Sequence, residues 1–371
     1  MVETSNLNRY HGTRRTRVTG YVAAHMSDPM SDEAPAVCVH HTAHRHIDAV
    51  AVGSAFTAIA ASSLTGDVWD GALTLLSNID GAEATVSRVV PTRGGNAGLA
   101  WVNAEVLATG DDRGDLTIWQ VLAPTGAEAG AAMTPLASFG EHSQPVTAVT
   151  ATSSGEARVA SSSLDGTAKV WAAVVAGGAT ATLEHLPQHT WCDVQALSVT
   201  WLGEAGQVLA TGASDGVVRV WDVRAASPAA RRFAPHSAPL LALTAGANEH
   251  QLLAASECGA LLLLDERQTA QPVVASQVQA SAPLTALSPL LAGGAAPLVG
   301  VGTADGTVAA VDPRDLAVIS RRVVHAGPVG GLAWLAPPAA GSRGTLLSGG
   351  WDKRLVCLPL GSGADSAGKA A

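Results

Sequence analysis

The chain has 371 residues, of which 47% are hydrophobic and only 14% are charged. Disordered chains are poor in apolar residues and rich in charge, so this composition excludes disorder over most of the length. The net charge of −9 argues against a general nucleic-acid binder, which needs a basic surface to displace counterions from phosphate.

The two ends of the chain differ from the rest. Residues 1–34 combine Ser, Asp and Pro with a basic run, and residues 361–371 are mostly Gly, Ala and Ser. We predict two flexible tails around one domain of residues 35–360. The N-terminus lacks the apolar core of a signal peptide, and prolines interrupt the longest uncharged stretch, residues 268–304. We therefore expect a soluble protein that is not secreted.

Between the tails the chain repeats one pattern: an apolar alternation, a turn and a second alternation. The predicted turns are at Gly71, Gly114, Gly166, Gly216, Gly259, Gly306 and Lys353. They recur roughly every 43–52 residues, which is typical of four-stranded propeller blades with loop insertions. Gly and Pro interrupt every window long enough for an amphipathic helix. The sequence predicts an all-β fold, a seven-bladed β-propeller.

A short alternating strand, Ala36–His40, stands ahead of the first repeat. A propeller ring that stayed open would leave a strand edge exposed. We therefore expect this strand to become the outer strand of the last blade, which contains Leu346–Leu360, and so to close the ring.

The first repeat reads ASSLTGDVWDGALTLL over residues 61–76. A turn at Gly71 leaves Thr65–Asp70 as extra residues and lifts Trp69 onto a loop. The alternative is a turn at Gly66, with Trp69 in the core. Tryptophan is enriched at the centres of protein interfaces. We expect a partner-binding site, whose candidate residues are Trp69, Leu64, Asp67, Val68 and, from the neighbouring last blade, Trp351.

Two middle repeats contain His, Ser or Thr, Asp and Trp in the same order. The two sets are His142, Ser161, Asp165 and Trp171, and His189, Thr211, Asp215 and Trp221. A buried carboxylate needs hydrogen-bond donors, and hydroxyl, imidazole and indole groups can supply them. We expect these tetrads to stabilise their blades.

The sequence contains no recognised catalytic motif. We find no Ser nucleophile elbow, phosphate loop or zinc-protease motif. The histidines 40, 41, 44 and 46 could bind a metal ion, but no Cys pair or carboxylate accompanies them at a fitting spacing. The four cysteines are scattered and form no CxxC pair. We expect a binding protein, with no enzyme activity, metal or cofactor.

The repeats resemble the WD-repeat family from about Val37 to Leu360. The features that carry the resemblance are the Asp-Gly turn, a Trp five residues later, the Trp221-Asp222 pair and an upstream His. The resemblance implies a seven-bladed WD-repeat propeller, in which each tetrad is hydrogen-bonded within a blade.

Within that family, three segments resemble the WD-repeat subunits of the methylosome, the non-catalytic partners of the type II protein arginine methyltransferase. The segments are the first repeat, residues 98–121 and residues 346–360. The resemblance implies that Trp69 inserts into the N-terminal barrel domain of the methyltransferase. It also implies that the propeller helps to present basic substrates, histones and Sm proteins, for symmetric arginine dimethylation in the cytoplasm and nucleus.

Two other functions stay open. One is a different WD-repeat scaffold, such as a ubiquitin-ligase substrate receptor or a histone-binding escort. The other is a propeller enzyme with its active site in the central channel, for which the sequence lacks a catalytic set.

Overall fold

In the computed structural model, the described parts of the chain are residues 36–42, 45–65, 68–77, 79, 83–124, 130–152, 157–176, 180–185, 194–203, 206–225, 231–233, 236–268, 272, 274–278, 282–290, 297–335 and 344–360. Every regular element in these ranges is a β-strand. The two predicted tails fall outside them. No helix in the described ranges is long and apolar enough to cross a bilayer.

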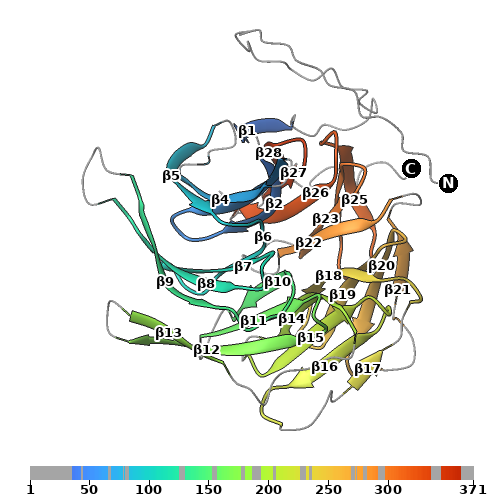
Figure 1. The fold of residues 1–371 in the computed structure, drawn as a ribbon. Coiled ribbons are helices and arrows are strands. Elements are labelled where there is room, and N and C mark those ends of the chain that lie inside the picture. Colours follow the sequence, from blue (N-terminus) through green and yellow to red (C-terminus); the bar gives the residue numbers. More distant parts are fainter. Residues whose placement is uncertain are drawn as a thin grey trace, which may run out of the picture. The chain divides into compact units, whose positions relative to one another are not determined.

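The strands form seven antiparallel four-stranded sheets, here called blades one to seven (Figure 1). Blade one contains β2 (His46–Val52), β3 (Thr57–Thr65), β4 (Val68–Ser77) and β5 (Thr85–Thr92). Blade two contains β6 (Asn96–Trp101), β7 (Val106–Asp111), β8 (Leu116–Leu122) and β9 (Ala132–Phe139). Blade three contains β10 (Val146–Ala151), β11 (Arg158–Ser163), β12 (Ala168–Ala176) and β13 (Thr180–His185).

The other four blades repeat this order. Blade four contains β14 (Ala196–Leu202), β15 (Val208–Ala213), β16 (Val218–Asp222) and β17 (Arg231–Phe233). Blade five contains β18 (Leu240–Ala245), β19 (Gln251–Ser256), β20 (Ala260–Asp265) and β21 (Val274–Gln277). Blade six contains β22 (Leu284–Leu290), β23 (Leu298–Thr303), β24 (Thr307–Val311) and β25 (Val318–Val323). Blade seven contains β26 (Val329–Leu335), β27 (Thr345–Gly350), β28 (Arg354–Pro359) and β1 (Val37–His41).

The first strands of successive blades lie side by side around the axis, and β26 of the last blade contacts β2 of the first. Each first strand shifts register against the second by one residue, as between Ile47 and Ala49 in blade one. Such bulges increase the twist of a strand pair. The bulge recurs in every blade, so the sheets pack in the same twisted form around the ring.

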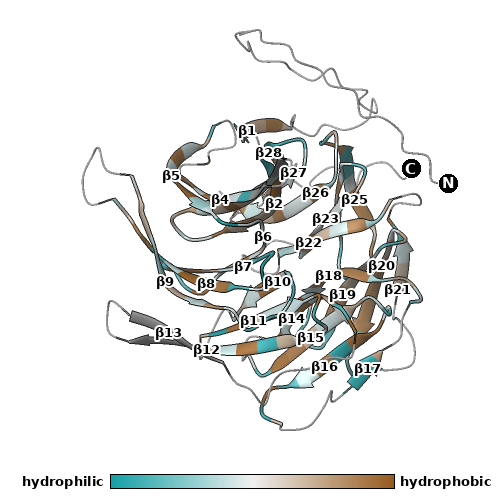
Figure 2. Ribbon diagram, in the orientation of Figure 1, coloured by the Kyte–Doolittle hydropathy of each residue, from teal (hydrophilic) through white to brown (hydrophobic). Residues whose placement is uncertain are grey.

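Hydrophobic residues fill the spaces between neighbouring blades. One buried cluster joins Leu202 and Val220 of blade four to Leu252 and Leu262 of blade five, and Phe233 closes its outer side. Figure 2 shows the contrast between the hydrophobic strand β20 and the largely hydrophilic outer strand β17. Because each blade is apolar on both faces, it is stable only between two others.

The ring closes through β1. This strand is antiparallel to β28, with Val37 opposite Cys357 and His41 opposite Arg354. The N-terminal strand is therefore the outer strand of the blade whose other three strands end the described chain.

The first blade corrects the prediction of a turn at Gly71. Gly71 lies inside β4 opposite Ser62, and the pairing continues to Thr65 opposite Val68. Trp69 is therefore a strand residue, and the predicted loop is wrong. Position 71 requires a glycine for a different reason: a Cβ there would collide with the carbonyl oxygen of Gly94.

The sequence between the two strands explains the true position of the turn. Gly66-Asp67 is a dipeptide typical of two-residue hairpins, and Thr65 and Val68 on either side are β-branched. The pairing therefore continues past the point where other blades turn. Gly66 and Asp67 themselves, and the side chains of residues 64–69, lie outside the described part of the chain.

Candidate protein-interaction surface

The hairpin β3–β4 is longer than its counterparts. In blade two the second strand ends at Asp111 and the third begins at Leu116. In blade one the strands add the pairs Ser62–Gly71, Ser63–Asp70, Leu64–Trp69 and Thr65–Val68. At about 3.3 Å per residue these four pairs lengthen the hairpin by roughly 13 Å. The candidate residues Leu64, Val68 and Trp69 belong to this extension.

Two polar contacts hold the base of the extension. The Ser63 hydroxyl donates to Asp70 Oδ1 at 2.5 Å, and Arg45 Nη2 donates to Asp70 Oδ2 at 2.6 Å. These hydrogen bonds, that of Ser63 first and that of Arg45 second, lower the pKa of the Asp70 carboxyl. Asp70 therefore stays ionised at neutral pH and ties the hairpin to the start of the first blade.

Trp351 lies beside this base. Its side chain is 48% exposed, and its ring centroid is 5.5 Å from that of His46. His46 Nδ1 also contacts the Trp351 carbonyl oxygen, and His46 is paired with Ser62 at the foot of the extension. The structure thus brings Trp351 to the side of the extended hairpin.

The turn that carries Trp351 has an unusual backbone. Blades two to six place a glycine with positive φ in the turn between the second and third strands, and blade seven has Lys353 there with φ of 72°. The left-handed region is costly for a residue with a Cβ. The Lys353 carbonyl oxygen accepts from the Thr42 amide at 2.9 Å, which holds this turn against the chain leaving β1.

The tetrad residues of blade three are joined by hydrogen bonds. The Trp171 indole donates to Ser161 Oγ at 3.1 Å, and Ser161 Oγ is 2.8 Å from His142 Nε2. His142 Nδ1 is 3.1 Å from Asp165 Oδ2. The distances fit a neutral imidazole that donates from Nδ1 to the carboxylate and accepts from Ser161 at Nε2. All these groups therefore act within the blade.

Blade four contains only part of the hydrogen-bonded set seen in blade three. The Trp221 indole donates to Thr211 Oγ1 at 3.0 Å, as in blade three. Asp215 instead accepts from Arg219 Nη2 at 2.7 Å. His189 lies outside the described part of the chain, so its predicted contact with Asp215 is not described.

A further set was missed by the sequence analysis. His325 Nδ1 is 2.8 Å from Asp352 Oδ1, and His325 Nε2 is 2.8 Å from Ser348 Oγ. Leu358 occupies the strand position of the tetrad Trp, which hid the relationship. The available signal was the spacing, since Ser348 precedes Asp352 by the same interval that separates Ser161 from Asp165.

The arrangement of hydroxyl, imidazole and carboxylate in blade seven has the connectivity of a nucleophilic triad. Ser348 is 0% exposed and His325 is 3% exposed, so a substrate cannot reach the hydroxyl. The set stabilises the last blade. Within the described ranges, His, Cys, Asp and Glu form no group of three or more able to hold a metal ion. His44, one of the predicted histidines, lies outside those ranges.

Acidic residues gather on the face formed by the turns between second and third strands. All these turns lie at the same end of their blades, because the strand order is the same throughout. Their acidic residues in blades two to seven are Asp112, Asp115, Asp165, Asp215, Glu257, Asp305 and Asp352, of which Asp165 and Asp352 are largely buried. Arg113 and Lys353 are the basic residues of the same turns. We call this surface the acidic turn face.

Beneath the acidic turn face lies a carboxyl with a shifted pKa. Burial raises the pKa of Asp48 to about 6, although hydrogen bonding with Ser62 and the charge of His46 oppose this change. Asp48 is in β2, close to the foot of the extended hairpin.

The comparison with protein-family models gives a match in two places. Residues 133–172 and 181–222 match "WD40: WD domain, G-beta repeat". The first range runs from β9 to β12 and the second from β13 to β16, so each sequence repeat begins with the outer strand of the preceding blade. The propeller contains WD40 repeats.

WD40 propellers generally serve as non-catalytic scaffolds for protein interaction, and this general role is what the family match supports. A search of curated proteins gave no match to this WD40 propeller. Among solved structures it is similar to the computationally designed Ika8 protein, with a TM-score of 0.57 and 17% sequence identity. The similarity covers 87% of this chain and 99% of that chain, and at this identity it shows the fold alone.

Proposed function

We propose that this WD40 propeller is a non-catalytic adaptor that binds a type II protein arginine methyltransferase. The observation that carries the proposal is the extended β3–β4 hairpin. In blade two the corresponding pairing stops at Gly110–Leu116, so that blade has no such extension. Trp69 stands next to the last pair of the β3–β4 hairpin, in the segment that resembles methylosome WD-repeat subunits. In this function Trp69 inserts into the N-terminal barrel domain of the methyltransferase.

Trp351 extends the proposed contact to the foot of the hairpin. A half-exposed indole is suited to the centre of an interface, because it buries a large apolar area and keeps one N–H donor. The Ser63–Asp70–Arg45 contacts support the proposal as well, since a fixed hairpin loses little conformational entropy on binding.

The acidic turn face supports the second half of the proposed function. Histones and Sm proteins have basic, arginine-rich segments, and a surface with acidic residues in six turns attracts them electrostatically. The adaptor would hold these substrates near the methyltransferase in the cytoplasm and nucleus for symmetric arginine dimethylation.

The first prediction concerns Trp69→Ala. We expect this variant to lose co-purification with the methyltransferase and to keep a melting temperature within a few degrees of the wild type, because the extension lies beyond the paired core of blade one. Val323→Ala is the matched control: it truncates a 72% exposed side chain in the outer strand of blade six. Unchanged capture of the methyltransferase by Trp69→Ala would show that the anchor is elsewhere.

Mass spectrometry of proteins captured from the native cell separates this function from its alternatives. An arginine methyltransferase among the captured proteins supports the adaptor. A ubiquitin-ligase subunit or a histone without the methyltransferase would replace it with one of the other scaffold functions.

A further inference from the structure

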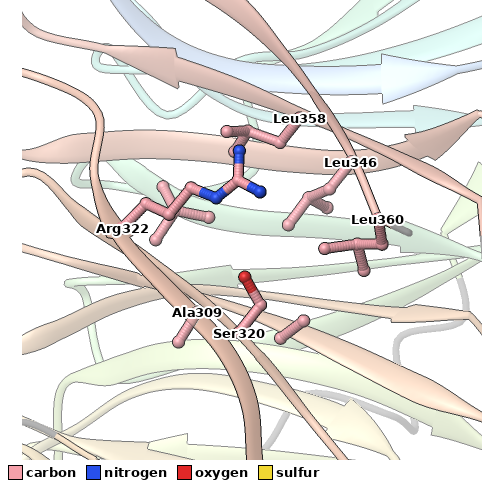
Figure 3. A pocket seen from close by; sticks show the side chains of 8 residues that line it. Ala309, Ser320, Arg322, Leu346, Leu358 and Leu360 are labelled. Atoms are coloured by element: carbon pink, nitrogen blue, oxygen red, sulfur yellow. The ribbon is translucent and has the colours of Figure 1, made fainter. Parts of the chain in front are cut away.

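The spaces between blades are closed by side chains from the outer strand of one blade and the third strand of the next. Between blades four and five, Phe233 and Leu262 belong to the same buried hydrophobic cluster. Between blades six and seven, Leu346, Leu358 and Leu360 leave a gap of only about 10 Å³, lined also by Ser320 and Arg322 (Figure 3).

The seam between blades seven and one is built differently. By strand register, His40 of blade seven corresponds to Phe233 of blade four. His40 is paired with Leu355 and Phe233 with Val218, and these two partners occupy the same position in the third strands of their blades. By the same comparison, Thr74 of blade one corresponds to Leu262 of blade five. An imidazole and a hydroxyl therefore stand where the other interface has a phenyl ring and an isobutyl group.

This exchange leaves a cavity of about 190 Å³. Its walls are His40, His41, Thr42 and Arg45 on one side and Ala61, Ala72, Thr74 and Val89 on the other. A water molecule takes up about 30 Å³ in the liquid, so the cavity has room for a small molecule of several non-hydrogen atoms. It is a different space from the buried hydrophobic cluster that joins the same two blades below it.

Each of these polar side chains can donate a hydrogen bond, although a hydroxyl and a neutral imidazole can also accept one. Burial, and after it the neighbouring His41, lowers the pKa of His40, which favours its neutral imidazole. Arg45 Nε is buried and has no hydrogen-bond partner among the described residues, although Nη2 of the same guanidinium binds Asp70. Thr74 adds a hydroxyl from a residue that is 5% exposed, and two imidazoles face it from β1. No acidic residue lines the cavity in the described part of the chain. Donors without matching acceptors favour a ligand that brings oxygen acceptors.

We propose that the seam cavity is a binding site for a small oxyanion, a phosphate or a short carboxylate. Arg45 and the imidazoles of His40 and His41 bind its oxygens, and Thr74 donates a hydrogen bond from the opposite wall. The two alanines give the ligand its space. The proposal does not depend on the methyltransferase function, since no residue of the cavity belongs to the hairpin extension itself, although Arg45 also binds Asp70 at the base of that extension.

The test is isothermal titration of the full-length protein at low salt with inorganic phosphate and, separately, with succinate. We expect saturable binding of one or both anions. Phosphate alone would assign a phosphoryl ligand, and succinate alone a carboxylate. The variant His40→Phe/Thr74→Leu copies the packing of blades four and five, so it should abolish binding and keep or raise the melting temperature. His250→Phe is the control, because this histidine contacts Glu266 at a different place.

Thr74→Val provides a second variant of nearly unchanged shape. It removes one donor and should weaken binding about tenfold, which corresponds to about 1.4 kcal/mol. The absence of saturable binding of either anion to the wild-type protein would overturn the proposal. Unchanged binding to His40→Phe/Thr74→Leu would overturn it as well, since the anion would then bind elsewhere.

Discussion

The carboxylate of Asp165 shows how a WD40 blade accommodates a charge in its interior. Its side chain is only 7% exposed. Burial alone would raise its pKa, but hydrogen bonds from Thr167 and the Ser143 amide, together with His142, hold the pKa below the usual value. The cost of burying the charge is offset by donors that the neighbouring turn and strand place around it.

Replacing this carboxylate should be costly. We expect Asp165→Ala to lower the free energy of unfolding by about 1–3 kcal/mol, because it removes the acceptor of the Ser143 amide and one of the two partners of His142 Nδ1. Asp215→Ala should cost less, since Asp215 is 32% exposed and its main partner is Arg219. Urea unfolding of the two variants checks this order, and equal losses would contradict the structural difference.

Lys353 illustrates a local departure from the repeat. It occupies a left-handed position that glycine fills in five other turns. The pattern of turn spacing locates this residue correctly, but nothing in the pattern indicates that a lysine will accept the strained conformation. The contact between its carbonyl oxygen and Thr42 appears only when the ring is closed.

Among the elements, β1 has the largest structural consequence for its size. It has five residues, and it covers the outer edge of β28 and one side of Cys357, which is 0% exposed. Without β1, blade seven would end in an unpaired strand.

Removing β1 should therefore open the last blade. We expect a variant lacking residues 1–41 to lose about 2–4 kcal/mol of unfolding free energy, through lost strand hydrogen bonds and the exposure of Val39's apolar neighbours. A thiol reagent should then label Cys357. The control lacks only residues 1–35 and should match the wild type in both measurements. An unlabelled Cys357 at an unchanged urea midpoint would argue against the closing role.

In the β3–β4 hairpin, the spacing of the repeats and the local strand propensity favour different positions of the turn. The spacing of the glycines favours a turn at Gly71, but the β-branched residues around Gly66-Asp67 extend the ladder past it. Local strand propensity decides the position of the turn here, and the glycine of the repeat serves a close backbone approach to Gly94.

For the molecule as a whole, the net charge is −9, and arginines pair with some of the aspartates, among them Asp215 of the acidic turn face with Arg219. On the face opposite the acidic turn face, aspartates are neutralised by arginines two residues later, in the pairs Asp222–Arg224, Asp265–Arg267 and Asp312–Arg314. We expect basic segments to be attracted by the exposed acidic residues of the acidic turn face, such as Glu257.

This distribution leads to a prediction for an arginine-rich peptide. Glu257→Lys should weaken its binding about two- to threefold at low salt, because Glu257 is an exposed charge on the acidic turn face. Glu105→Lys makes the same charge change in an exposed turn at the other end of blade two and should have little effect. Fluorescence anisotropy at two salt concentrations provides the measurement. Equal effects of the two variants, or binding that does not change with salt, would show that the acidic turn face does not attract the peptide electrostatically.

The all-β class, the seven blades and the hydrogen-bonded set in blade three could all be predicted from the sequence. These features follow from periodic apolar residues, turn glycines and side chains at fixed intervals, all of which are local in the chain. The sequence also singled out Trp351 as a tryptophan that the blade core does not need. Three features became visible only in the folded chain: the length of the β3–β4 hairpin, the His325–Ser348–Asp352 set and the cavity between His40 and Thr74. Each of these depends on which residues face one another across strands or across the closed ring, and that pairing is fixed by packing between segments far apart in the chain.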